Sequence, residues 1–561
     1  MTNRELSKLQ VRSEVLAVIQ QLSSLDETSR ENQHKQIKRL KTIANTNYIL
    51  ECLIRELPKT TYDQRQVIAQ LLLEFGTLET LDGPLWSLIK DPDITDEVKD
   101  IANSVLRNLG DPTDSDTYLS YLKNPQELID KETERMLKVA SLNPEAQIDF
   151  LDFLFSLPPV EQENLIDSLK NDYPGEYLTY IFIPAILVQP TDEITNILIN
   201  SLGNTKSPRA LTFLEELYDL TSNDIRKKII KKNINLLKLA GAKPYNDNYK
   251  YKLDTIIYKC YASSIDGVGN QGIIVSRLKN NGDVSLLSVV INDIQGIIDC
   301  FGFNQITTAD FERIVNKFQD NTHNKDLPPE YCKNRIKEAE QLSKILNLPI
   351  SYEYTSWKTL ADDINEFDNN LDNLLTELKD NNLLQSTDKL YDIQNFHCWF
   401  IEDDDHPEIS NYFENILSYI IDKIENDNCS YEEVLEYYNS LIDNNIEQIF
   451  SSTWKKIYYN RLINEMYLFN NNDQKEYAQL AATAAWSLSN ESSIKLNENK
   501  FIIKLMQKST VEALLRFQYE LSNNQKNSNI LKSEEQYQIL KDIINNLFVT
   551  WQVDFEKNTL S

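Results

Sequence analysis

The chain has no closely paired cysteines, and this absence limits the class of protein. Its six cysteines stand far apart along the sequence: Cys52, Cys260, Cys300, Cys332, Cys398 and Cys429. Without a CxxC pair, the pattern is typical neither of a disulfide framework nor of a zinc ribbon. Scattered cysteines are typical of reduced thiols, so we expect a cytoplasmic protein.

Long apolar runs are also missing. The longest, residues 178–188, is interrupted by Pro184 and is about half the roughly 20 residues that a membrane span requires. The first residues, from Met1 onward, lack the apolar core of a signal peptide. We therefore expect no membrane span.

Positive charge is scarce in one part of the chain. The net charge is −29, and residues 351–450 hold 4 Lys and Arg against 24 Asp and Glu, a local net charge of −20. Such a field repels phosphate backbones and favours cationic partners or metal ions. The charge argues against nucleic acid as a partner, although acidic excess also serves solubility alone.

Two stretches of the N-terminal part repeat a helical pattern. Apolar side chains in 94–109 follow the three-and-four spacing of one helical stripe. The second stretch, 207–241, places Ser207 as an N-cap and Pro208 at the first helical position, with a break at 220–223. Glycines close successive helices at a repeat-like spacing: Gly76, Gly110, Gly203 and Gly241.

These two stretches resemble HEAT-like repeats, of the kind found in bacterial phycobilisome-lyase-like repeat proteins. The resemblance covers residues 1–244 only and implies an α-solenoid with an extended binding surface. It also implies that Val98, Lys99, Ile225 and Arg226 serve helix stacking. A weaker implication is a bilin-handling, lyase-like function.

Glycine marks a different region. Six of the twelve glycines lie between Gly267 and Gly302, and none follows. Runs 253–265, 272–278 and 284–291 are rich in Ile, Val and Tyr and are separated by turn residues, which predicts a three-stranded antiparallel meander. Helices near 307–319 and 329–347 complete a small α+β domain, 250–350.

From residue 365 to 561 the pattern is helical again, in a domain that changes from acidic to neutral. The predicted fold is therefore mainly α: a HEAT-like α-solenoid over 1–244, a small central antiparallel meander within 250–350, and a helical C-terminal domain over 365–561. A length of 561 residues suits several domains, because single cores stop growing near 250 to 300 residues.

The segment Gly267-Val268-Gly269-Asn270-Gln271-Gly272 matches GxGxxG. A dinucleotide site needs a helix directly after this motif, whereas Ile273 begins a strand-like run. A kinase loop needs a lysine on the next strand, which is absent. We therefore interpret the motif as a glycine-rich turn.

A second segment, 396–408, gathers histidines and carboxylates that could ligate a divalent cation: His397, Glu402, Asp403, Asp405 and His406. The spacing matches neither an EF-hand loop nor HExxH. The alternative is a buried aromatic anchor, including Trp399, followed by a solvated acidic loop.

A basic cluster stands out in this acidic chain: Arg226, Lys227, Lys228, Lys231 and Lys232. It could hold an acidic partner or the chain's own acidic block, or it could be a solvated helix face. Taken together, the sequence favours a cytosolic scaffold or adaptor that binds another protein and expects no cofactor. The alternative is a metal-dependent hydrolase with a site between the central sheet and the C-terminal helices. The oligomeric state is left open.

Overall fold

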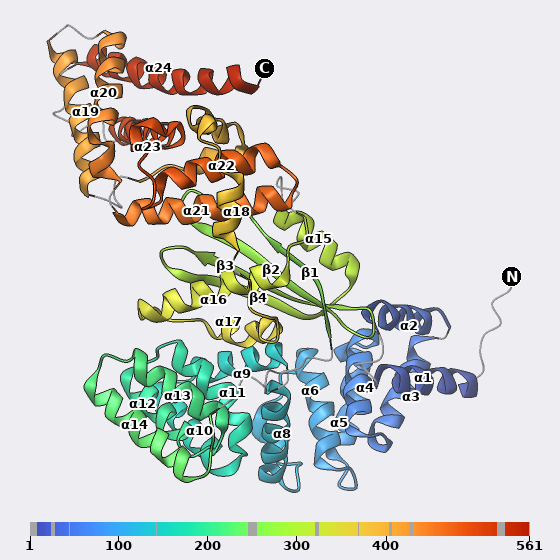
Figure 1. Cartoon of the computed structure of the whole chain (residues 1–561). Helices are drawn as coiled ribbons and strands as arrows, with labels where there is room; N and C mark the ends of the chain where they lie inside the picture. Colours follow the sequence, from blue (N-terminus) through green and yellow to red (C-terminus); the bar gives the residue numbers. More distant parts are fainter. Residues whose placement is uncertain are drawn as a thin grey trace.

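The computed structural model describes residues 8–23, 29–43, 45–141, 143–244, 255–319, 325–368, 370–402, 407–426, 430–450, 452–523 and 533–559. These ranges are mainly helical, with one four-stranded antiparallel sheet. In Figure 1 the sheet lies between the N-terminal helices and the C-terminal helices. None of the described helices is both long and apolar enough to cross a membrane.

The N-terminal helices follow one another along one side of the molecule, from α1 to α14 (Figure 1). Their bounds are α1 Lys8–Ser23, α2 Arg30–Ile43, α3 Thr46–Glu56, η1 Leu57–Lys59, α4 Tyr62–Phe75, α5 Leu78–Lys90, α6 Asp96–Asn108, α7 Ser115–Leu119, α8 Pro125–Ala140, α9 Pro144–Ser156, α10 Pro159–Asp172, α11 Gly175–Leu187, α12 Asp192–Leu202, α13 Pro208–Leu220 and α14 Asp224–Leu239. Neighbours such as α5 and α6, or α13 and α14, pack against each other. Their apolar faces form two clusters, one within residues 11–118 and one within 137–237.

All four glycines that were predicted to close helices lie at helix ends. Gly76 and Gly203 are the C-cap residues of α4 and α12, and Gly110 and Gly241 directly follow the C-caps of α6 and α14. Of the four, Gly110 and Gly241 adopt the left-handed backbone that favours glycine, with φ of 91° and 89°. At Gly203 the reason for glycine is packing, because a Cβ would lie 2.0 Å from the amide oxygen of Asn233.

The four residues predicted to serve stacking behave differently from one another. Val98 and Lys99 are buried, and the Lys99 ammonium donates to the backbone oxygen of Tyr121 at 2.8 Å. Ile225, by contrast, is 72% exposed, so it does not pack between helices. It lies on the outer face of α14, because only the opposite face of that helix meets α12 and α13.

The sheet contains four strands rather than the three predicted: β1 Ile256–Ala262, β2 Asn270–Leu278, β3 Val284–Asn292 and β4 Gly296–Ile306. They pair in sequence order, β1-β2-β3-β4. The prediction missed β4 because Asp299 and Gly302 interrupt its apolar pattern. Gly302 is required there, since a Cβ would lie 2.3 Å from the ring of Trp357.

Helices cover both faces of the sheet. On one face lie α16 Pro329–Ile345, α17 Tyr352–Trp357 and the 3-10 helix η3 Lys358–Ala361, sharing a core with Val275 and Val289. On the other face α15 Thr308–Gln319 packs on Ile274 and Leu286. Helices α15 and α16 lie close to the predicted ranges.

The C-terminal helices form the largest apolar cluster. Their bounds are α18 Leu371–Leu378, η4 Asn381–Asp392, η5 Gln394–Cys398, α19 Pro407–Glu425, α20 Tyr431–Ile449, α21 Ser452–Asn471, α22 Lys475–Leu488, η7 Leu496–Glu498, α23 Lys500–Asn523 and α24 Glu534–Thr559. The alanine-rich α22 packs closely against α21, and its residues Ala481 and Ala485 are fully buried. Small side chains permit this close approach.

Candidate functional site

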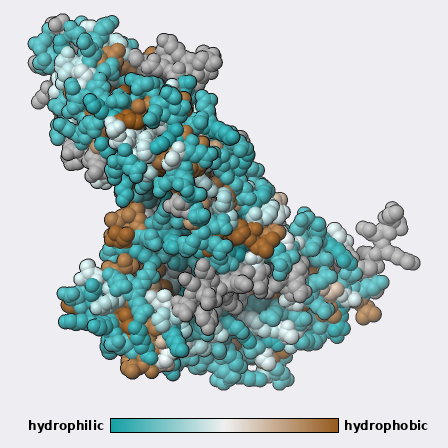
Figure 2. Space-filling view, in the orientation of Figure 1, coloured by the Kyte–Doolittle hydropathy of each residue, from teal (hydrophilic) through white to brown (hydrophobic). Residues whose placement is uncertain are grey.

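A large cavity lies between the N-terminal helices and the helices of the sheet unit. We call it the seam cavity. Its volume is about 620 Å³, and it opens between α11–α14 on one side and α16, α17 and η3 on the other. In Figure 2 apolar patches lie on both sides of this seam at the left of a mostly hydrophilic surface. A pocket of this size suits a small ligand or part of a partner.

One wall of the seam cavity carries a compact group of charges. Glu340 accepts from Lys344 at 2.9 Å, from Lys358 at 3.0 Å and from the Tyr354 hydroxyl at 2.6 Å. Lys344 also pairs with Glu216 of α13, across the seam. Burial tends to raise the pKa of Glu340, but the two lysines and the Tyr354 hydroxyl outweigh it and hold that pKa well below its usual range. Glu340 is therefore a structural anion, engaged by its neighbours.

The predicted basic cluster divides into two parts. Arg226 lines the seam cavity and pairs with Asp192, and the ammonium of Lys227 lies 5.6 Å from the ring centre of Tyr218. Lys228, Lys231 and Lys232 are exposed and form no ion pair with another described residue. The first part stabilises the end of the N-terminal helices, and the second is free for a partner.

The described helices of the acidic block 351–450 do not cover this cluster. Its acidic helices α19 and α20 lie at the opposite end of the molecule from α14 (Figure 1). Of the described residues of the block, Thr355, Lys358 and Asp362 reach the same region, because they line the seam cavity together with Arg226. Contact between the lysines of α14 and helices α19 and α20 of the same chain is therefore excluded by distance.

The predicted metal ligands lie partly outside the described residues, which do not include Asp403, Asp405 and His406. His397 is half-buried, with Nε2 3.0 Å from the backbone oxygen of Tyr391. Burial lowers the pKa of His397 despite that hydrogen bond. Among the described residues, no group of three or more His, Cys, Asp or Glu side chains is placed to hold a metal ion. The metal site stays a prediction.

The aromatic residues before this loop form part of the core. Phe396 and Trp399 are fully buried, and the Trp399 indole donates to the backbone oxygen of Ile265 at 2.8 Å. This contact joins the C-terminal helices to the glycine-rich turn between β1 and β2. The alternative of a buried aromatic anchor is thus what the structure shows for these two residues.

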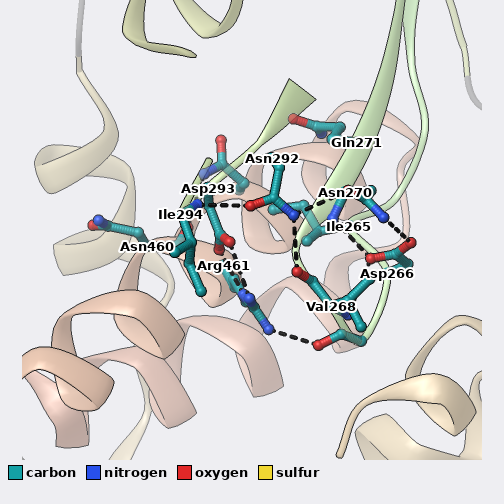
Figure 3. A network of polar contacts seen from close by, with 12 residues as sticks. Ile265, Asp266, Val268, Asn270, Gln271, Asn292, Asp293, Ile294, Asn460 and Arg461 are labelled. Carbon is teal, nitrogen blue, oxygen red and sulfur yellow. Dashed lines mark hydrogen bonds and ion pairs between the residues drawn. The ribbon is translucent and has the colours of Figure 1, made fainter. Parts of the chain in front are cut away.

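The glycine-rich turn serves packing. A Cβ at Gly267 would lie 1.6 Å from the backbone oxygen of Cys398, so only glycine lets the two backbones approach. Figure 3 shows Arg461 of α21 bonded to Asp293 and reaching the turn. Its guanidinium donates to Asp293 at 2.6 and 3.0 Å and to the Gly267 oxygen at 2.8 Å. The turn therefore anchors the C-terminal helices to the sheet, and its chemistry is structural.

One turn of helix beyond Arg461, a carboxylate is fully buried at the same junction. Glu465 accepts from the backbone N–H of Ile265 at 2.7 Å, while its second oxygen has no partner. Burial raises the pKa of Glu465 to about 7, although the bonds from Ile265 and Ser264 oppose the rise. We therefore expect the stability of this junction to depend on pH.

Apart from Arg226, sequence reasoning missed the charged groups that line the seam cavity, and it missed the pair formed by Arg461 and Asp293. Partners such as Glu216 and Lys344 are 128 positions apart, so no local pattern signals them. Comparison with known protein families, curated proteins and solved structures finds no match to this chain.

Proposed function

We propose that this chain is a scaffold that binds another polypeptide on its N-terminal helices, arranged as a HEAT-like row. The observation that carries the proposal is the outer face of α14. Lys228, Lys231 and Lys232 are exposed there without an ion-pair partner among the described residues, in a chain with a net charge of −29.

Apolar side chains on the same face support a docking role. Ile225 and Leu239 are 72% and 85% exposed, and they stand at the two ends of α14 with the lysines between them. The 15 residues from Ile225 to Leu239 place these two side chains about 21 Å apart along the helix axis. A partner segment that carries carboxylates between two apolar residues would match this face in charge and in length.

The proposal is tested by site-specific photo-crosslinking in the full-length chain. A photoreactive amino acid at Ile225 should crosslink to another polypeptide, and the same amino acid at Ile129 of α8, which is 51% exposed, should not. The triple variant Lys228→Glu, Lys231→Glu, Lys232→Glu should abolish the crosslink at Ile225. The charge-matched control, Lys123→Glu, Lys131→Glu, Lys138→Glu, changes three exposed lysines on or beside α8 and should keep it.

Equal crosslinking at Ile225 and Ile129, or a crosslink that survives the α14 charge reversal, would contradict binding at this face. The metal-dependent hydrolase and the bilin-handling protein are not proposed, because no arrangement within the described ranges favours either one.

A further inference from the structure

The seam cavity holds one cation and one anion that are not paired. Arg209 and Asp362 both line it, and neither forms an ion pair with another described residue. Arg209 projects from α13, whereas Asp362 follows η3, so the two charges approach the cavity from opposite sides of the seam. Asp362 is exposed and Arg209 is half-buried, so a ligand can reach both groups from solvent.

Both groups are held in place by their surroundings. The Arg209 guanidinium lies 4.4 Å from the ring centre of Tyr180, in a cation–π contact between α13 and α11. Its helix begins at Pro208, so the position of Arg209 is set by the first helical turn.

Asp362 is fixed through its backbone. Its carbonyl oxygen accepts from Lys333 at 3.1 Å. On either side of it, Arg277 donates to the Leu360 oxygen at 2.7 Å and pairs with Asp363. Arg277 is only 2% exposed, so these contacts hold the backbone on both sides of Asp362 rigidly.

The other charged side chains of the seam cavity are engaged. Lys344 and Lys358 share Glu340, Lys344 also pairs with Glu216, and Arg226 pairs with Asp192. The lining thus balances four cations against four carboxylates: Arg209, Arg226, Lys344 and Lys358 against Asp192, Glu216, Glu340 and Asp362. A ligand with a large net charge of either sign meets as much repulsion as attraction from this lining. A zwitterion can place each of its two charges beside a side chain of opposite charge.

The remaining wall is apolar. It is built by side chains from α11, α13 and the segment after α16: Ile183, Ile186, Leu187, Phe213, Leu217, Leu220, Leu348 and Ile350. Leu220 and Leu348 are 43% and 38% exposed, so part of this wall is open to an apolar group. Each Å² of apolar surface that a ligand buries against this wall contributes about 25 cal/mol of favourable free energy.

We infer that the seam cavity binds a small dipolar ligand with an amino-acid-like head and an apolar body, either a free apolar amino acid or a short apolar peptide. The carboxylate or carbonyl of the head accepts from Arg209, whose planar fork suits such groups. The ammonium or N–H of the head donates to Asp362. The apolar body lies among the leucines and isoleucines of the wall. A volume of about 620 Å³ falls in the range of small-ligand pockets.

Isothermal titration of the full-length chain with L-leucine and, separately, with tri-leucine tests this inference and distinguishes its two sources. We expect at least one probe to bind saturably, and Arg209→Gln and Asp362→Asn each to weaken it by roughly ten-fold or more. Leu217→Trp, which fills the cavity without touching the head group, should also abolish binding. Lys337→Gln, which removes an exposed lysine of α16 that does not line the cavity, should leave it unchanged.

The absence of saturable binding of both probes at millimolar concentration would overturn the inference, and so would binding that all three cavity variants retain. Circular dichroism and thermal melting establish that each variant is folded. Crosslinking at Ile225 reports on the outer face of α14, so its failure and the failure of the cavity site are separate results.

Discussion

The molecule contains two seams of opposite character. Where the sheet meets the C-terminal helices, backbone touches backbone at Gly267, and Arg461 is buried with 2% of its surface exposed. Where the sheet unit meets the N-terminal helices, long side chains such as Lys344 and Glu216 span the gap and leave a cavity of about 620 Å³.

The difference shows why one seam is filled and the other leaves a cavity. Gly267 lets the two backbones approach each other, and a buried guanidinium takes the place of water, so the seam between the sheet and the C-terminal helices is filled. Where the sheet unit meets the N-terminal helices, paired long side chains keep the neighbouring helices apart. This seam therefore stays open and can accept a ligand. We therefore expect substitutions to affect stability at the first seam and binding at the second.

The largest expected effect is at Arg461. Arg461→Met leaves the Asp293 carboxylate and the Gly267 oxygen without their donors in a buried site, which should cost about 3 to 5 kcal/mol of unfolding free energy. The control, Arg226→Met, removes a pair whose side chains are 26% and 84% exposed and should cost about 0 to 1 kcal/mol. Denaturant unfolding followed by tryptophan fluorescence measures both. Equal losses of unfolding free energy in the two variants would show that the two seams do not differ in their contribution to stability.

Glu465, in the seam between the sheet and the C-terminal helices, should lower the free energy of unfolding as pH rises. Its pKa of about 7 in the folded chain exceeds the ordinary 4.5, so folding takes up a proton between these values. Stability is unaffected below pH 4.5, falls from there to pH 7, and stays lower above it by about 3 kcal/mol. Glu465→Gln should abolish this loss between pH 5 and pH 8 in unfolding measurements. Glu436→Gln, on the exposed face of α20, should not.

The close approach of the Gly267 and Cys398 backbones predicts an intermediate effect on stability. Gly267→Ala places a methyl group against the Cys398 oxygen and should destabilise the chain by about 1 to 3 kcal/mol. Gly83→Ala, on α5, meets no atom within 4 Å and should stabilise it by about 0.5 to 1 kcal/mol. Thermal melting compares the two variants. A neutral Gly267→Ala would show that the two backbones can separate at no cost.

The smallest effect on stability is expected on the outer face of α14. Replacing Lys228, Lys231 and Lys232 with alanine should change the unfolding free energy by no more than about 0.5 kcal/mol per residue, because none forms an ion pair with another described residue. Loss of the Ile225 crosslink with unchanged melting would separate binding from stability. A large fall in melting temperature would instead assign these lysines to the fold.

Local patterns predicted much of this fold. The helix at 94–109 follows from apolar spacing. The pair at 207–241 follows from its N-cap and first-turn proline, and α13 and α14 separate at the predicted break. The strand β4 was missed because Gly302 serves contact with Trp357, a residue 55 positions away in sequence. Of the candidate site, the basic cluster was found from its charge, whereas the unpaired state of Arg209 and Asp362 was not.

The sequence by itself determined the helical character of both ends, the strand-forming middle and the place of the excess negative charge, because these depend on neighbours within a few residues. Only the tertiary structure decided which charges are paired, which glycines serve packing, and where a cavity remains. Those properties depend on contacts such as Arg461 with Asp293, 168 positions apart, whose distance and burial no local pattern contains.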